Sequence, residues 1–280
     1  MLVTRYHDEV VKAKPRPRAI HCHLRRLAKD VSGTKLSEIN AEWWVAWAKK
    51  MPCSPASRKR YFTLLIGALS TADTLWRLSV NWPEIKRARA VLERAGLIGR
   101  AANRDRRISD DEIASIKAHA KSAVPLADIV DFAVLTAMRA AEITRIRWSD
   151  IDRTRGTVLV RDRKHPKHKF GNHQWVPLLG NALAIIDRQP KVDERIFPYK
   201  EESVECAFRR AWKAAKLSGL TFHGLRHEAT SRLFEAGYEL PFVAMVTGHL
   251  DWNGLRKYTH LKNRNPAQGG VPLTGLDVSA

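Results

Sequence analysis

A change of pattern near residue 100 divides this chain of 280 residues into two parts. Between Gly96 and Ile108 the sequence carries glycine, asparagine and four arginines, a composition typical of a linker. Ser109 and Glu112 then stand three residues apart before an apolar run at helical spacing, which is the capping-box signature of a new helix. We therefore expect a first domain over 1–95, a linker over 96–108, a second domain over 109–262 and an irregular tail over 263–280.

The first part contains helical patterns only. Ser54 followed by Pro55 predicts a helix start, because serine caps free amides and proline tolerates the first helical position. We interpret Trp43, Trp44 and Trp47, which crowd one short segment, as the hydrophobic core of a small bundle. Helices are expected over 19–28, 42–50 and 54–76.

The second part mixes helical and strand patterns. Short β-branched runs at 157–161 and 174–178 predict a hairpin. Helices are expected over 111–121, 126–138, 140–148, 202–216, 223–236 and 240–247. The predicted fold is thus mainly α with a small β-sheet, arranged as a helical N-terminal domain followed by a mixed α+β domain.

Charge indicates the kind of partner. The chain has 49 Lys and Arg against 29 Asp and Glu, a formal net charge of +20. Such an excess favours a polyanion, and nucleic acid fits best because phosphate neutralisation releases counterions. No apolar run approaches the roughly 20 residues that span a bilayer, and the N-terminus lacks the hydrophobic core of a signal peptide, so no membrane partner is expected.

Cysteine and histidine spacing argues against a metal site. The three cysteines are scattered without Cys-x-x-Cys spacing, which indicates a reducing, intracellular compartment. His165, His168 and His173 match no standard tetrahedral pattern. We expect no metal.

Three short segments far apart in the sequence gather basic, imidazole and phenol side chains. Residues 135–143 include Arg139, residues 222–227 read Phe-His-Gly-Leu-Arg-His, and a Gly-His pair at 248–249 precedes Tyr258. A tyrosine hydroxyl loses its proton only near pH ~10, so a nucleophilic tyrosine needs such neighbours. Guanidinium groups match phosphate oxygens and keep their charge, so a phosphodiester is the natural electrophile.

In these motifs the chain resembles the tyrosine recombinase family, which includes phage integrases and bacterial Xer-type enzymes. The resemblance is weak over about 20–95 and strong over about 108–262. Carried over position by position, it implies a catalytic set of Arg139, Lys164, His223, Arg226, His249 and Tyr258.

Each residue receives a role from this resemblance. Arg139 and Arg226 would clamp the scissile phosphate and stabilise its transition state. His223 would act as general base or proton relay, and His249 as a second phosphate donor. We interpret His227, the next residue after Arg226, as a structural histidine of the helical core.

The general-acid lysine is chosen by its place on the hairpin. Lys164 closely follows the first strand, where the family's lysine lies, whereas Lys167 and Lys169 are interpreted as DNA-backbone contacts. Glu142, one helical turn after Arg139, is interpreted as a carboxylate that positions a basic group. Further backbone contacts are expected from Arg58, Lys59, Arg60, Arg104, Arg106 and Arg107.

The resemblance implies a site-specific DNA recombinase whose two domains clamp duplex DNA. Tyr258 would form a 3′-phosphotyrosyl link and free a 5′-hydroxyl, without a cofactor, because guanidinium groups replace a metal as the charge clamp. The implied assembly is a homotetramer on two duplexes. The implied location is the cytoplasm, with a bacterial or phage-encoded protein that joins the nucleoid when bound.

Two alternatives stay open. A type IB topoisomerase-like enzyme would use similar chemistry to relax one duplex as a monomer. A DNA-binding regulator could retain the fold without the reaction. Integration, excision and dimer resolution are equally compatible with the residues.

Three positions depart from the family pattern. Ala137 stands where glycine is common, Gly224 where an acidic residue is usual, and Glu228 where a hydroxyl residue is common. None of them removes a catalytic group.

Overall fold

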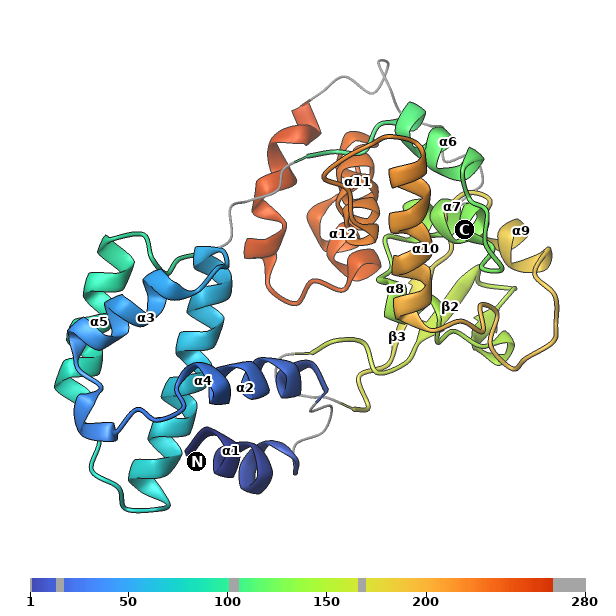
Figure 1. The fold of residues 1–280 in the computed structure, drawn as a ribbon. Coiled ribbons are helices and arrows are strands. Elements are labelled where there is room, and N and C mark those ends of the chain that lie inside the picture. Colours follow the sequence, from blue (N-terminus) through green and yellow to red (C-terminus); the bar gives the residue numbers. More distant parts are fainter. Residues whose placement is uncertain (1, 14–17, 101–105, 166–169, 264–280) are drawn as a thin grey trace. The chain divides into compact units, whose positions relative to one another are not determined.

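The protein divides into two compact units, Met1–Arg104 and Asp105–Ala280. The computed structural model, drawn in Figure 1, describes residues 2–13, 18–100, 106–165 and 170–263. The division falls inside the segment 96–108 that the sequence predicts as a linker. Each unit has its own hydrophobic core.

The first unit is helical throughout its described residues. Its elements are α1 (Leu2–Tyr6), a π-helical turn (His7–Val11), α2 (Arg18–Asp30), a 3-10 turn (Leu36–Glu38), α3 (Ala41–Lys50), α4 (Pro55–Thr74) and α5 (Trp82–Arg94). Ser54 accepts from the backbone of Ser57 with Pro55 in the first turn, as expected. Helix α5 was not predicted, although Asn81 caps it and accepts from the backbone of Glu84.

The tryptophans of α3 form part of this core, as predicted. Trp44 and Trp47 are buried, and Trp43 packs on them from a partly buried position. The ring of Trp44 meets Phe62 of α4 edge-on, with centroids 4.7 Å apart. These contacts join α3 to α4.

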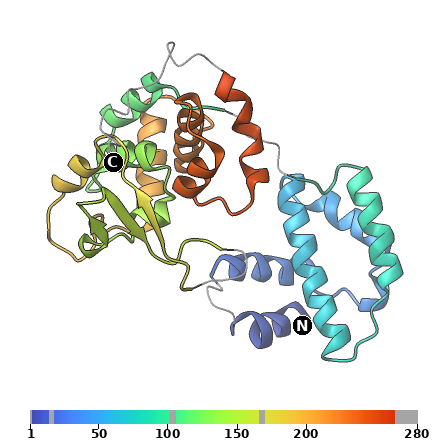
Figure 2. The ribbon, with the colours of Figure 1, turned by 180° about the vertical axis from the view of Figure 1, so that it is seen from behind.

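The second unit combines helices with a small sheet, which confirms the predicted fold class (Figures 1 and 2). Its helices are α6 (Asp110–Ala118), α7 (Leu126–Thr136), α8 (Ala140–Ile143), α9 (Ala182–Asp187), α10 (Glu201–Ala214), α11 (Phe222–Glu235) and α12 (Leu240–Thr247). Three 3-10 segments accompany them, at Trp148–Asp150, Trp252–Gly254 and Arg256–Asn263. Helix α7 packs against α6, α9, α10 and α11.

The sheet contains one strand more than predicted. Strands β2 (Thr157–Val160) and β3 (Gln174–Pro177) form the expected antiparallel hairpin, with Val158 opposite Val176. The added strand β1 (Ile151–Asp152) pairs with β2, giving the order β1-β2-β3. Two residues are too few to show an alternating pattern in the sequence.

In this unit one helix prediction was wrong and one helix was missed. The helix expected over 140–148 ends at Ile143, because Arg147 adopts an extended conformation and pairs with Arg195 in an isolated β-bridge. Helix α9 was not predicted at all. In the described ranges, no helix has both the length and the apolar character needed to cross a membrane.

Candidate active site

A left-handed residue at the end of α7 sets the position of Arg139. Ala137 has φ +51°, so the chain turns sharply, and Arg139 then lies extended at the start of α8. A left-handed conformation costs an L-residue roughly 1–2 kcal/mol, which accounts for the glycine common here in the family. Glu142 accepts from the backbone N–H of Arg139 at 3.0 Å and from its Nη1 at 2.6 Å. The guanidinium is thereby held in place, as the sequence predicts.

Arg226 joins two helix ends from within α11. Its side chain is almost fully buried, and it donates through Nη1 to the carbonyl of Ala137 at 2.7 Å and through Nη2 to the carbonyl of Thr247. Burial and the nearby charge of Arg139 lower the pKa of Arg226 to about 9. That value still leaves the guanidinium charged at neutral pH, in a place where an incoming anion would be strongly attracted.

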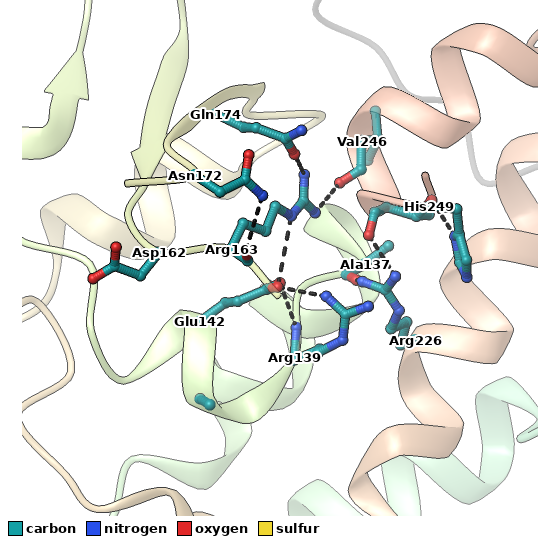
Figure 3. A network of polar contacts seen from close by, with 12 residues as sticks. Ala137, Arg139, Glu142, Asp162, Arg163, Asn172, Gln174, Arg226, Val246 and His249 are labelled. Carbon is teal, nitrogen blue, oxygen red and sulfur yellow. Dashed lines mark hydrogen bonds and ion pairs between the residues drawn. The ribbon is translucent and has the colours of Figure 1, made fainter. Parts of the chain in front are cut away.

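A second buried arginine, Arg163, completes this network and was not predicted (Figure 3). It donates to Oε1 of Gln174 at 3.1 Å and to the carbonyls of Met245 and Val246 at 2.9 and 2.6 Å. Its Nε lies 3.6 Å from Oε1 of Glu142, and both side chains are only 1% exposed. Arg163 therefore ties the hairpin to the end of α12.

The charge of Glu142 is maintained by these arginines. Burial alone would raise the pKa of the Glu142 carboxyl, but the charges of Arg163, Arg139 and Arg226 hold it below its usual value. Glu142 is therefore ionised and positions two guanidinium groups rather than one. The sequence predicted the first of these pairings and not the second.

His249 follows a left-handed glycine at the end of α12. Gly248 has φ +68°, and Nδ1 of His249 shares a 2.7 Å hydrogen bond with Oγ1 of Thr247. Burial, together with the charges of Arg226 and Arg139, lowers the pKa of His249 to about 4. The imidazole is thus neutral at pH 7. Oγ1 of Thr247 donates its own hydrogen to the carbonyl of Val243, so it accepts from Nδ1–H of His249, and Nε2 of the neutral ring is unprotonated.

Tyr258 lies beside α11, where its hydroxyl contacts a histidine that the sequence pattern left outside the catalytic set. Nδ1 of His227 is hydrogen-bonded to the Tyr258 hydroxyl. The rings of His223 and His227 meet edge-on, with centroids 4.9 Å apart. The ring of His227 thus contacts His223 on one side and Tyr258 on the other. This histidine was interpreted from the sequence as structural.

His223 is close to the same charges. Although His223 is exposed, partial desolvation and the positive charges of His227, Arg226, Arg139 and Lys164 lower its pKa. Lys164 itself is exposed, directly after the buried Arg163. Lys164 is the last of the charges that lower the pKa of His223, and its role as general acid stays a prediction. Lys167 and Lys169 lie outside the described residues.

The six residues assigned to catalysis come from five segments distant in sequence: the start of α8, the hairpin, α11, the end of α12 and the last 3-10 segment. Hydrogen bonds of Arg226 join α11 to the ends of α7 and α12, and His227 joins α11 to Tyr258. The assignment and the individual roles stay predictions.

Several residues predicted to contact DNA have partners within the protein. Arg58 donates to the carbonyls of Met51 and Leu97, and Lys59 pairs with Glu93 at 3.1 Å. Arg60 is exposed, and no carboxylate pairs with it among the described residues. Their contacts with DNA stay predictions.

The linker arginines bind carboxylates of the second unit. Arg106 pairs with Glu112 at 2.5 Å. Arg107 binds both oxygens of Glu228 at 2.8 Å and also pairs with Glu235. Their predicted DNA contacts also stay predictions, and Arg104 lies outside the described residues. The unusual Glu228 is therefore explained by its ion pair with Arg107.

Gly224 also has a steric explanation. A β-carbon at this position would lie 3.2 Å from Cδ1 of Ile108, closer than most such contacts. The acidic residue usual in the family would crowd that isoleucine. Within the described ranges, no three histidine, cysteine or acidic side chains gather in a way that could hold a metal ion.

Comparisons with known proteins show the family. The chain belongs to the phage integrase family, whose model matches residues 106–265. It is 33% identical over 165 residues to a shufflon-specific DNA recombinase of Escherichia coli, covering 58% of this chain and 42% of that protein. It is 24% identical over 232 residues to the integrase of Salmonella phage P22, covering 76% of this chain and 56% of that protein.

The fold matches solved integrase structures. A lambda integrase (residues 75–356) dimer bound to a COC′ core site superposes with a TM-score of 0.71 at 22% identity, covering 94% of this chain and 96% of that one. The Tn1549 transposon integrase in complex with a circular intermediate DNA gives a TM-score of 0.67 at 15% identity, covering 92% and 93%. At these identities the likeness establishes the fold alone.

Proposed function

We propose that this protein is a site-specific DNA recombinase that cleaves and rejoins DNA through a 3′-phosphotyrosyl intermediate. The observation that carries the proposal is the place of Tyr258 beside α11: its hydroxyl is hydrogen-bonded to His227, the residue after the buried Arg226, whose guanidinium binds the ends of α7 and α12. Family membership and the similarity to named recombinases support it.

The proposed reaction begins with attack of the Tyr258 oxygen on the scissile phosphorus. A new phosphorus–oxygen bond forms as the bond to the 5′-oxygen breaks. Arg139 and Arg226 stabilise the charge on the non-bridging oxygens, because their donors are already fixed by the protein. His249 joins them as a donor once the negative charge of the bound phosphate raises its pKa and protonates the ring. Lys164 donates a proton to the departing 5′-oxygen.

The covalent link allows the reverse reaction without an energy source. A 5′-hydroxyl from a second duplex attacks the phosphotyrosyl phosphorus, and Tyr258 leaves. Exchange between duplexes requires several active sites, and we propose a homotetramer on two duplexes. A lambda integrase tetramer bound to a Holliday junction has the same fold, with a TM-score of 0.72. We place the reaction in the cytoplasm, on double-stranded DNA.

The sequence of the DNA target can be found from the reaction itself. Full-length protein is mixed with fragmented DNA, adducts are trapped by denaturant, and the attached DNA is sequenced. Two copies of the recovered sequence are then placed on one plasmid. We expect excision or inversion between the copies, and none with Tyr258→Phe. Relaxation of supercoils without site dependence would instead indicate a topoisomerase, and binding without an adduct would indicate a regulator.

A further inference from the structure

We propose that His227 is the catalytic residue that accepts the phenolic proton of Tyr258, an inference that rests on the proposed function. The sequence pattern assigned this role to His223 and assigned His227 to the core. In the structure, the Tyr258 hydroxyl is hydrogen-bonded to Nδ1 of His227, and in the tautomer with Nδ1 unprotonated the hydroxyl donates to it. A general base must lie within hydrogen-bond reach of the proton it removes, and His227 meets this condition.

The position of His227 follows from helix geometry. It lies in α11 directly after Arg226 and four residues after His223, so His227 and His223 share one face of the helix. The helix continues for about two turns beyond His227. The hydroxyl of Ser231 donates to the carbonyl of His227 at 3.1 Å. The histidine is therefore held by a rigid helix rather than by a loop.

The ring of Tyr258 is also fixed by packing against Phe234. The ring of Tyr258 stacks on Phe234, with centroids 6.2 Å apart and planes 12° apart, while the ring of His227 lies 6.2 Å away. Tyr258 is only 7% exposed. Since little water reaches the phenol, a protein group is needed to take its proton.

Nearby positive charge favours removal of this proton. Nζ of Lys257 lies 3.5 Å from Nδ1 of His227 and 4.8 Å from the centroid of the Tyr258 ring. Arg226 also interacts electrostatically with Tyr258. These charges stabilise a developing phenolate more than a neutral phenol.

The proton balance is as follows. As the tyrosine oxygen bonds to phosphorus, its proton passes to Nδ1 of His227, and the 5′-oxygen takes a proton from Lys164. On rejoining, the 5′-hydroxyl returns its proton to Lys164, and the leaving tyrosine oxygen recovers the proton held by His227. No other acid or base is consumed.

The test variant is His227→Asn, because an asparagine amide occupies the place of Nδ1 and can hydrogen-bond but cannot take a proton. We expect the rate of covalent adduct formation to fall at least about 100-fold, within the usual range for a lost general base. The control is His119→Asn, an exposed histidine of the same unit, which should react at the wild-type rate. A loss of less than about 3-fold in His227→Asn would overturn the proposal.

A substrate with sulfur in place of the 5′-bridging oxygen separates a base from an acid. A thiolate leaves without protonation, so this substrate should rescue Lys164→Ala. It should not rescue His227→Asn. Rescue of His227→Asn would show that His227 serves the leaving group and would overturn its assignment as the base.

A second variant keeps the test independent of folding defects. Adding free imidazole to His227→Ala should raise adduct formation at least about 10-fold, since a diffusible base can occupy the vacated space. A residue with a purely structural role would show no such response, and the absence of rescue in a variant that binds DNA normally would contradict the proposal. Failure of the wild type itself to form a Tyr258 adduct would instead refute the proposed function.

Discussion

Gly248 lies against the guanidinium of Arg163, with no room between them for a side chain. A β-carbon on Gly248 would stand 2.4 Å from Nε and 2.5 Å from Cζ of Arg163. Two separate features therefore require glycine at position 248: its backbone φ of +68° and the close contact with Arg163. The close contact lets Arg163 reach the carbonyls of Met245 and Val246 in the last turn of α12, shortly before His249.

Gly248→Ala should therefore be more damaging than an ordinary substitution at a positive φ. The matched control is Gly237→Ala, which has φ +85° and no atom within 4 Å of its β-carbon. We expect the control to lose about 1 kcal/mol of unfolding free energy and Gly248→Ala to lose a further 1–3 kcal/mol. Denaturant unfolding of both variants measures the difference. Equal losses of unfolding free energy in the two variants would show that the contact with Arg163 does not affect stability.

Arg163 and Glu142 should be energetically coupled. Arg163→Met leaves a buried carboxylate with one partner fewer, at a cost of about 3 kcal/mol. Glu142→Gln removes that charge, so the double variant should be more stable than the sum of the two single losses predicts, by about 1–3 kcal/mol. Unfolding curves of the four proteins give this value. Additivity within about 0.5 kcal/mol would contradict the pairing.

Two neighbouring arginines of α4 should behave differently. Arg60 is exposed, so its replacement by alanine should leave the free energy of unfolding unchanged. If Arg60 contacts a phosphate, the slope of log binding constant against log salt concentration should become shallower by about 1. Arg58 donates to the carbonyls of Met51 and Leu97, so Arg58→Ala should instead destabilise the first unit, by about 1–3 kcal/mol. Binding titrations at several salt concentrations and thermal unfolding separate the two effects. An unchanged salt slope in Arg60→Ala would remove this residue from the DNA contacts.

The pKa of His249, lowered to about 4, predicts how stability changes with acidity. In the unfolded chain this imidazole takes up a proton near pH ~6.5, whereas in the folded protein it stays neutral. The unfolded state therefore binds more protons as the pH falls from about 6.5 toward 4, and the free energy of unfolding decreases across that window. NMR titration should show no change of charge on this ring between pH ~7.5 and ~5.5. A midpoint near 6.5 for His249 would contradict the burial and charge described for it.

Most of the site was predictable because its residues stand in short local motifs. The spacing of Arg139 to Glu142 and of His223 to Arg226 reflects helix geometry, which local sequence preserves. Arg163 was missed because its partners Met245 and Val246 are 82 and 83 residues away. No local pattern distinguishes it from the many solvated basic residues of this chain.

His227 was missed for a different reason, since a signal was present. Its spacing of four from His223 places both imidazoles on one face of a predicted helix. If His223 faces the tyrosine, His227 could have been predicted to face it as well. The start of α5 was also visible, with Asn81 as cap and Pro83 in the first turn. By contrast, the strand Ile151–Asp152 forms only because β2 is beside it, so it depends on tertiary structure.

The central claim is that Tyr258 is the nucleophile. The full chain is incubated with nicked DNA duplexes of random sequence, trapped in denaturant and digested, and the peptide carrying a nucleotide is identified by mass spectrometry. Tyr238→Phe, which alters a tyrosine stacked on Phe242 outside the site, is the matched control. We predict a nucleotide joined through its 3′-phosphate to Tyr258, present in the control and absent in Tyr258→Phe. An adduct on another residue, or none in the wild-type protein, would contradict the account.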